Sequence, residues 1–152
     1  MEIKAKGKQM SNGNIEHICR FLASRPRYKL VVCRENPCAD ITPLNLGYAI
    51  STKVACLQDR TTLSYIAPSI VDEVINGAVT HVEDLGDVVV IENLGILFEP
   101  ELGLIPSDII MKHAKNKTFV LIWNGIYHNQ ALSYATDSNC IIDISNINHI
   151  AL

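Results

Sequence analysis

Two polar side chains, Glu92 and Asn124, follow apolar runs at positions where they could act on a nucleotide. The runs cover residues 88–91 and 119–123, and they resemble a Walker B strand and a sensor strand. In open α/β sheets the carboxyl ends of buried strands form the edge where ligands bind. A carboxylate beside an amide can orient a water molecule for attack on a phosphate. The alternative is that both side chains only hydrogen-bond the ends of their strands.

Helical and strand patterns alternate around these residues. Apolar spacing predicts helices over residues 15–25, 46–57, 62–75 and 106–113, and Pro68 is expected to kink the third helix or to begin its second half. Strands are predicted over residues 28–33, 87–91, 118–123, 131–135 and 141–147. The alternation favours an α/β fold with a mainly parallel five-stranded sheet and helices on both faces.

The segment that should hold a phosphate is missing from this pattern. No G-x-x-x-x-G-K-[ST] sequence occurs, and residues 34–43, which follow the first strand, contain neither glycine nor lysine. A P-loop needs glycine N–H groups that form an anion nest and a lysine that neutralises the phosphates. Arg34 and Arg60 could still supply charge for weak nucleotide binding. Arg60 could otherwise act as an arginine finger or form a surface ion pair.

Basic residues are concentrated near the amino terminus. Residues 1–34 hold eight of the thirteen Lys and Arg residues against two acids, whereas residues 35–152 hold five against fourteen. We predict a flexible basic tail over residues 1–12 and a single α/β domain over residues 13–152. The candidates for DNA contact are Lys4, Lys6, Lys8, Arg25 and Arg27. The alternative is a solvated tail with arginines at a helix end.

Composition narrows the class of protein. A chain of 152 residues that is 48% hydrophobic can bury one core. Its five cysteines are odd in number and contain no C-x-x-C pair, which favours buried free thiols in a reducing compartment. The five histidines show no metal-ligand spacing, so no metal is expected. No signal-like or membrane-spanning stretch is evident, so a cytoplasmic location and no membrane partner are expected.

Several segments together resemble one family of proteins. They are Leu44-Asn45-Leu46-Gly47, residues 87–102 with their Leu97-Phe98-Glu99-Pro100 stretch, Trp123-Asn124-Gly125 and Leu132-Ser133-Tyr134-Ala135. This set is similar to the BrxF family of small P-loop proteins from bacteriophage exclusion (BREX) defence systems. The resemblance implies a RecA-like or AAA-like core that works with other defence proteins.

The chain also departs from that family. The glycine-rich Walker A loop and its helix are absent, Glu92-Asn93 stands where an aspartate would hold Mg²⁺, and Ala114-Lys115 replaces a serine-arginine pair. We therefore expect a P-loop-type core that is degenerate at the phosphate-binding loop. Lysine in place of arginine also removes a bidentate phosphate contact.

The expected function is a noncatalytic subunit of a prokaryotic antiviral complex, acting through protein contacts in a homo- or hetero-oligomer without a cofactor. Leu97, Phe98 and Leu102 are the candidate contact residues; alternatively they pack under the following helix. One rival is an active ATPase that uses ATP and Mg²⁺ at an atypical or partner-completed phosphate site, with Glu92 and Asn124 as catalytic residues. Another is a DNA-binding adaptor that uses the basic amino-terminal region.

Overall fold

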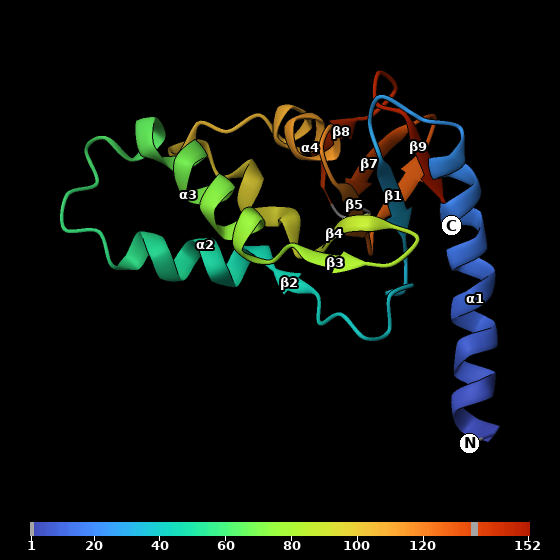
Figure 1. Ribbon diagram of the computed structural model, residues 1–152. Coiled ribbons are helices and arrows are strands. Elements are labelled where there is room, and N and C mark those ends of the chain that lie inside the picture. Colours follow the sequence, from blue (N-terminus) through green and yellow to red (C-terminus); the bar gives the residue numbers. More distant parts are fainter. Residues whose placement is uncertain (1, 135–136) are drawn as a thin grey trace.

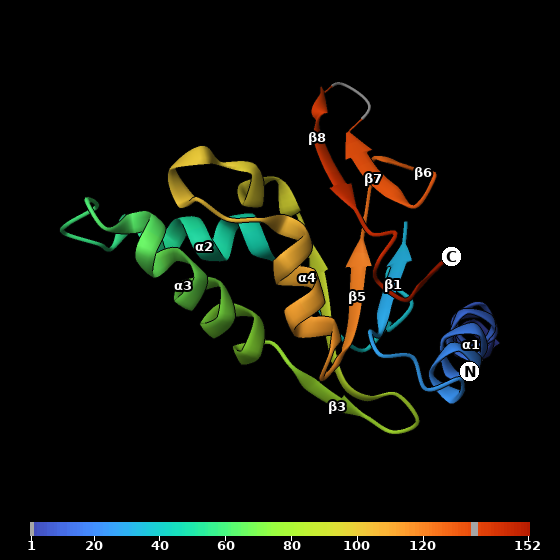
Figure 2. The same ribbon diagram turned by 90° about the horizontal axis from the view of Figure 1, so that it is seen from above.

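The fold is an α/β sheet covered on both faces, with a small second sheet at one end (Figures 1 and 2). The computed structural model describes the backbone of residues 2–134 and 137–152, and the side chains of residues 13–134 and 139–152. The helices are α1 (Glu2–Ala23), α2 (Leu46–Ala55), α3 (Leu63–Gly77) and α4 (Pro106–Ala114), with 3-10 segments η1 (Leu94–Phe98) and η2 (Pro100–Leu102). The strands are β1 (Leu30–Cys33), β2 (Leu44–Asn45), β3 (Thr80–Val82), β4 (Gly86–Glu92), β5 (Thr118–Ile122), β6 (Ile126–His128), β7 (Ala131–Tyr134), β8 (Asp137–Asp143) and β9 (His149–Ala151).

The main sheet has the strand order β2-β4-β5-β1-β9, and all of these neighbours are parallel. β3 pairs with β4 in the antiparallel direction. The register places Val120 of β5 beside Val90 of β4 and Val31 of β1. The predicted α/β fold with a mainly parallel sheet is therefore confirmed, and the strands predicted over residues 28–33, 87–91 and 118–123 form its centre.

The strands at the edges of the main sheet are not the predicted ones. The segments 131–135 and 141–147 are predicted as strands of the five-stranded sheet, but β7 and β8 lie in a separate antiparallel sheet, in which β7 pairs with both β6 and β8. Short connections allow only antiparallel pairing of successive strands, because a parallel pair needs a long crossover. The outer parallel strands are instead β2 and β9, which have two and three residues.

Helices cover both faces of the main sheet, as expected. Figure 2 shows α2, α3 and α4 on one side and α1 on the other. Ile18 of α1 is fully buried in a cluster with Val31 and Val120, and Leu22 packs at its margin. This agrees with the apolar stripe predicted for residues 15–25. The backbone of α1 begins at Glu2, so the helix also runs through the segment predicted as a tail.

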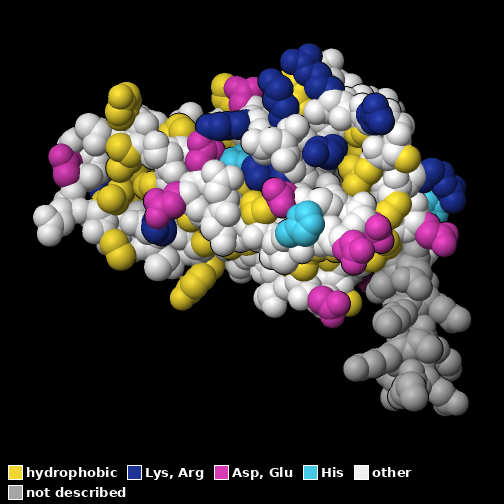
Figure 3. Space-filling view, in the orientation of Figure 1, with side chains coloured by type: hydrophobic (Ala, Val, Ile, Leu, Met, Phe, Trp, Pro, Cys, Tyr) yellow, Lys and Arg dark blue, Asp and Glu magenta, His cyan; other side chains and the backbone are white. Residues whose placement is uncertain are grey.

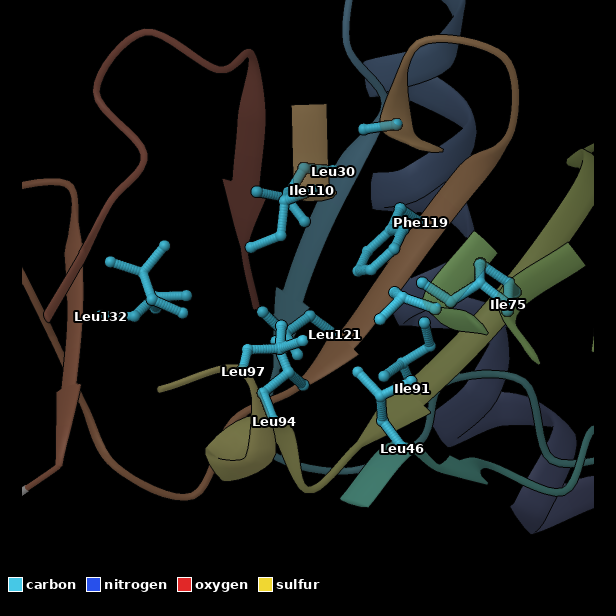
Figure 4. Close-up of a cluster of buried hydrophobic side chains, with 14 of the residues drawn as sticks. Leu30, Leu46, Ile75, Ile91, Leu94, Leu97, Ile110, Phe119, Leu121 and Leu132 are labelled. Carbon is cyan, nitrogen blue, oxygen red and sulfur yellow. The ribbon is translucent and has the colours of Figure 1, made fainter. Parts of the chain in front are cut away.

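The larger core lies under α2, α3 and α4 (Figure 4). Successive residues of β5 point to opposite faces, so Phe119 and Leu121 enter this core while Val120 enters the α1 side. Helix α3 contributes the stripe Leu63, Ala67, Val71 and Ile75. Pro68 lies at an exposed position inside α3. The helix continues through it as one element, so α3 is not divided into two helices. Because both faces are covered, the central strands are continuously apolar.

Candidate functional site

Glu92 and Asn124 line one hollow at the carboxyl edge of the main sheet. β4 and β5 are adjacent and parallel, with Ile91 opposite Leu121, so both chains leave the sheet on the same side. The hollow has a volume of about 340 Å³. Its other lining side chains are Asn45, Asn93, Leu94, Ile122, Trp123 and Tyr134. The structure thus brings together the two residues that sequence patterns predicted as neighbours.

A hydrogen-bonded group of amides forms one wall of this hollow. Asn93 has a left-handed backbone (φ 61°), which asparagine tolerates better than most residues, and its Nδ2 donates to Asn45 Oδ1 over 2.8 Å. The same Oδ1 accepts a hydrogen bond from the backbone N–H of Tyr48, which caps the amino end of α2. Gly47 N–H donates to the carbonyl of Asn93. These bonds tie the end of β4 to the start of α2.

The carboxylate of Glu92 and the carboxamide of Asn124 have no bonding partner among the described residues. Across the residues whose side chains are described, no hydrogen bond or ion pair engages either group. Asn124 is exposed and Glu92 is half-buried. The alternative that both only hydrogen-bond the ends of their strands is therefore not what the structure shows. Both groups are free to meet a ligand or a partner.

Trp123 also lines this hollow, and it hydrogen-bonds the second sheet. Its side chain is buried, and Nε1 donates to the carbonyls of Ile126 and Ser133 at 3.2 and 3.3 Å. The ring lies 4.7 Å from the ring of Tyr134, centroid to centroid. Burial raises the pKa of the Tyr134 hydroxyl, and the nearby Cys140 contributes in the same direction. The hollow is therefore walled by an aromatic pair as well as by amides.

The connector between β1 and β2, residues 34–43, is held by hydrogen bonds between its own residues. Asn36 Oδ1 accepts from the N–H of Cys38 at 2.9 Å, and Asn36 Nδ2 donates to the carbonyl of Ile41 at 2.7 Å. The N–H of Ile41 donates to the carbonyl of Cys38. Pro37 and Pro43 have no N–H to offer. As predicted, this segment is turns and extended chain, and no helix follows β1 directly.

The two arginines predicted to aid nucleotide binding lie in other hollows. Arg34 lines a hollow of about 220 Å³ at the ends of β1 and β9, with Trp123 and Leu152. Arg60 lines one of about 260 Å³ between α2, α3 and η2, together with Glu99 and Glu101. Neither arginine is among the side chains that line the Glu92 hollow. Arg34 nevertheless leaves β1 beside the end of β5, where Trp123 and Asn124 follow.

The apolar segment after β4 is largely core. Leu97 and Leu102 are 1% and 3% exposed, and Phe98 is half-buried with its ring edge-on to Tyr134. Figure 4 shows Leu97 beside Leu94 and Leu121. Of the two interpretations of Leu97, Phe98 and Leu102, packing against neighbouring elements is therefore the one that the structure shows. Ile96, Glu99, Glu101 and Leu102 of this segment line the Arg60 hollow.

Two of the cysteine thiols, Cys33 and Cys38, are buried. Burial raises the pKa of the Cys33 thiol to about 12, and it also raises the pKa of Cys38. Neither thiol is a ready nucleophile at neutral pH, because the thiolate is the reactive form. Cys56 is exposed, unlike the buried thiols expected from sequence. Within the described residues, no three His, Cys, Asp or Glu side chains are grouped to hold a metal ion.

Sequence patterns missed a buried polar cluster under α4. His113 Nε2 lies 2.8 Å from Asp72 Oδ1, and Lys117 Nζ lies 2.9 Å from His113 Nδ1. A lysine ammonium only donates, so Nδ1 accepts and the proton of the neutral imidazole lies on Nε2, facing the carboxylate. The sequence signal was weak, because Asp72 and His113 lie 41 residues apart. Asn45 and Asn93 were also missed as a pair, although asparagine before a helix is a recognised cap signal.

Comparison of the chain with family models, curated proteins and solved structures gave no match. In the described part of the chain, none of the helices has the length and apolar character that a bilayer span requires.

Proposed function

We propose that this chain is a noncatalytic subunit of a prokaryotic antiviral assembly, built on a P-loop-type core that lacks its phosphate site. The connector between β1 and β2 carries the proposal. It has no glycine and no lysine, and the N–H groups of Cys38 and Ile41 are already engaged within it. A triphosphate needs several free N–H groups at a helix N-terminus and a cation.

The remaining geometry supports a core of this type. Strand β5 lies between β1 and β4, and Glu92 and Asn124 end the two strands that would face a γ-phosphate. This arrangement is compatible with a RecA-like or AAA-like sheet. Arg34 and Arg60 line separate hollows, and neither is among the residues that line the Glu92 hollow. The resemblance of residues 87–102 to BrxF proteins supports the role in BREX-type defence.

In this proposal the chain acts by binding other proteins and not by hydrolysing a nucleotide. Tyr48 on α2 and Tyr65 on α3 are 72% and 85% exposed, and tyrosine is favoured at interfaces because it combines a large apolar ring with a polar end. Together they give this subunit surfaces for a partner in a defence complex.

Nucleotide titration and phage challenge test this proposal together. We expect no Mg²⁺-dependent ATP binding with a Kd below about 1 mM, which corresponds to only about −4 kcal/mol. In a host that carries the complete defence locus, Glu92→Gln should leave phage restriction unchanged, whereas deletion of this chain should abolish it. Replacing Tyr48 and Tyr65 together by serine should weaken restriction.

Micromolar ATP binding with turnover that Glu92→Gln abolishes would identify a working ATPase instead. Restriction that persists after deletion of the chain would exclude the defence role.

A further inference from the structure

Basic side chains gather at the amino edge of the main sheet, opposite the Glu92 hollow. They come from the α1–β1 connection and from the carboxyl end of α4, two segments far apart in sequence. Figure 3 shows Lys and Arg side chains gathered over these elements. We call this surface the basic edge; it consists of Arg25, Arg27, Lys29, Lys112 and Lys115. Only Arg25 and Arg27 were among the DNA-contact candidates predicted from sequence.

The folded core fixes the two segments against each other. The N–H of Lys29 donates to the carbonyl of Ala114 at 2.8 Å, and the N–H of Phe119 donates to the carbonyl of Lys29 at 2.8 Å. Tyr28 is 9% exposed, and its N–H donates to Asn148 Oδ1. Arg27 and Lys29 therefore project from an anchored segment beside the end of α4. The basic edge is a preformed part of the domain, distinct from residues 1–12.

Most of this charge is not neutralised by the protein. Lys112 pairs with Asp72. Within the described residues, no ion pair engages Arg25, Arg27, Lys29 or Lys115. The guanidinium of Arg27 lies 5.4 Å from the Tyr28 ring centroid, a contact that leaves its charge in place. Arg25, Arg27 and Lys115 are exposed and Lys29 is half-buried, so this edge presents unpaired cations although the chain has a net charge of −3.

We propose that the basic edge binds the phosphate backbone of duplex DNA without reading its sequence. The large apolar side chains that are exposed lie outside it: Tyr48, Tyr65, Ile105, Ile126, Tyr127, Ile141 and Leu152. A protein interface needs an apolar centre, which this edge lacks, whereas a duplex presents closely spaced charges. Without an exposed aromatic ring, the edge offers no platform on which unpaired bases could stack. This proposal stands apart from the proposed loss of ATP binding.

Fluorescence anisotropy of a labelled mixed-sequence duplex, titrated with the full chain over a range of salt, tests the proposal. Four phosphate contacts predict a slope of log K against log[salt] of about −3.6. The double variant Arg27→Gln/Lys115→Gln should weaken binding and reduce the magnitude of this slope by about 2. Lys53→Gln, which removes a cation on α2 that pairs with Glu73, is the matched control and should bind as the parent does.

A second full-length variant, Lys4→Gln/Lys6→Gln/Lys8→Gln, separates the basic edge from the amino-terminal lysines and should retain the slope that the edge supplies. The proposal is overturned if the parent does not bind the duplex at low salt, or if the edge variant binds as well as the parent while remaining folded by circular dichroism. It is also overturned if a poly-glutamate peptide or a single strand binds this edge more tightly than the duplex.

Discussion

Asn93 and Asn45, 48 residues apart, join the ends of β4 and β2 through a hydrogen bond of 2.8 Å. This bond closes one wall of the Glu92 hollow, and Gly47 makes it possible. A Cβ at position 47 would lie 2.6 Å from Asn93 Nδ2 and 3.1 Å from Asn93 Cγ. The absence of a side chain at Gly47 therefore determines where the Asn93 amide sits.

Gly47→Ala should lower the free energy of unfolding by about 1–3 kcal/mol, because the new Cβ forces Asn93 to move and its hydrogen bond to Asn45 is lost. Urea denaturation measures this change. Gly13→Ala is the control, since a Cβ there meets nothing within 4 Å. Within helix α1 it should be neutral or stabilise by up to about 1 kcal/mol. Equal effects of the two substitutions would contradict the role given to Gly47.

Gly125→Ala should be more damaging. A Cβ at this position would clash with the backbone oxygen of Ser133 and would lie 2.8 Å from Trp123 Nε1. Backbone cannot yield as a side-chain end can, so we expect a loss of about 3 kcal/mol or more, at the upper end of overpacking costs. Trp123 fluorescence should also shift as its indole loses its acceptors. If the variant has the stability and fluorescence emission of the parent, Gly125 and Trp123 do not hold the β6–β7 hairpin as described.

Asp72→Asn should destabilise the fold by about 1–3 kcal/mol, because buried His113 loses its charged acceptor. Glu73→Gln next to it is the control. The Glu73 side chain is 67% exposed and pairs only with exposed Lys53, so a change within about 0.5 kcal/mol is expected. Denaturation of both variants at neutral pH makes the comparison, and equal losses would show that the Asp72–His113 contact contributes nothing.

Stability should also fall as the pH drops below about 6.5. Burial lowers the pKa of His113 below its ordinary 6.5, although the hydrogen bond that its Nε2–H donates to Asp72 acts in the opposite direction. The unfolded chain then binds a proton that the folded chain does not, so acid favours unfolding. Burial acts to raise the pKa of Asp72, but hydrogen bonds from Lys112 and His113 hold it below 3.8, which adds a second loss in stronger acid.

His113→Gln should be less stable than the parent at pH 7 but should show a flatter decline between pH 6.5 and pH 5, an interval near the ordinary histidine pKa. Unfolding midpoints across this range measure the two slopes. Identical slopes in the parent and the variant would assign the acid sensitivity to other groups.

Leu97→Ala should cost about 2–5 kcal/mol, as expected for a fully buried leucine. Ile105→Ala is the control because Ile105 is 59% exposed, and its removal should cost little. Thermal denaturation separates the two. A near-neutral Leu97→Ala would instead favour the view that this segment is a surface for partners.

Much of the fold could be predicted because its central elements carry their own signals. The continuous apolar runs of β1, β4 and β5 mark strands covered on both faces, and Pro106 marks the start of α4. The position of Glu92 and Asn124 at one hollow also followed from the apolar runs of β4 and β5, because adjacent parallel strands end at the same edge of the sheet. The short β2, β3 and β9 have too few residues for any periodic pattern, and they form only because longer strands present free edges.

The residue types alone determined that the segment after β1 lacks the glycines and lysine of a phosphate cradle, because no fold can supply groups that the chain does not contain. Only the tertiary structure decided where dispersed side chains meet. Asp72, His113 and Lys117 form one cluster, Arg34 and Arg60 line hollows other than that of Glu92, and the backbone of Lys29 lies beside that of Ala114. These relations depend on how elements pack across long separations in sequence, and local periodicity does not encode such separations.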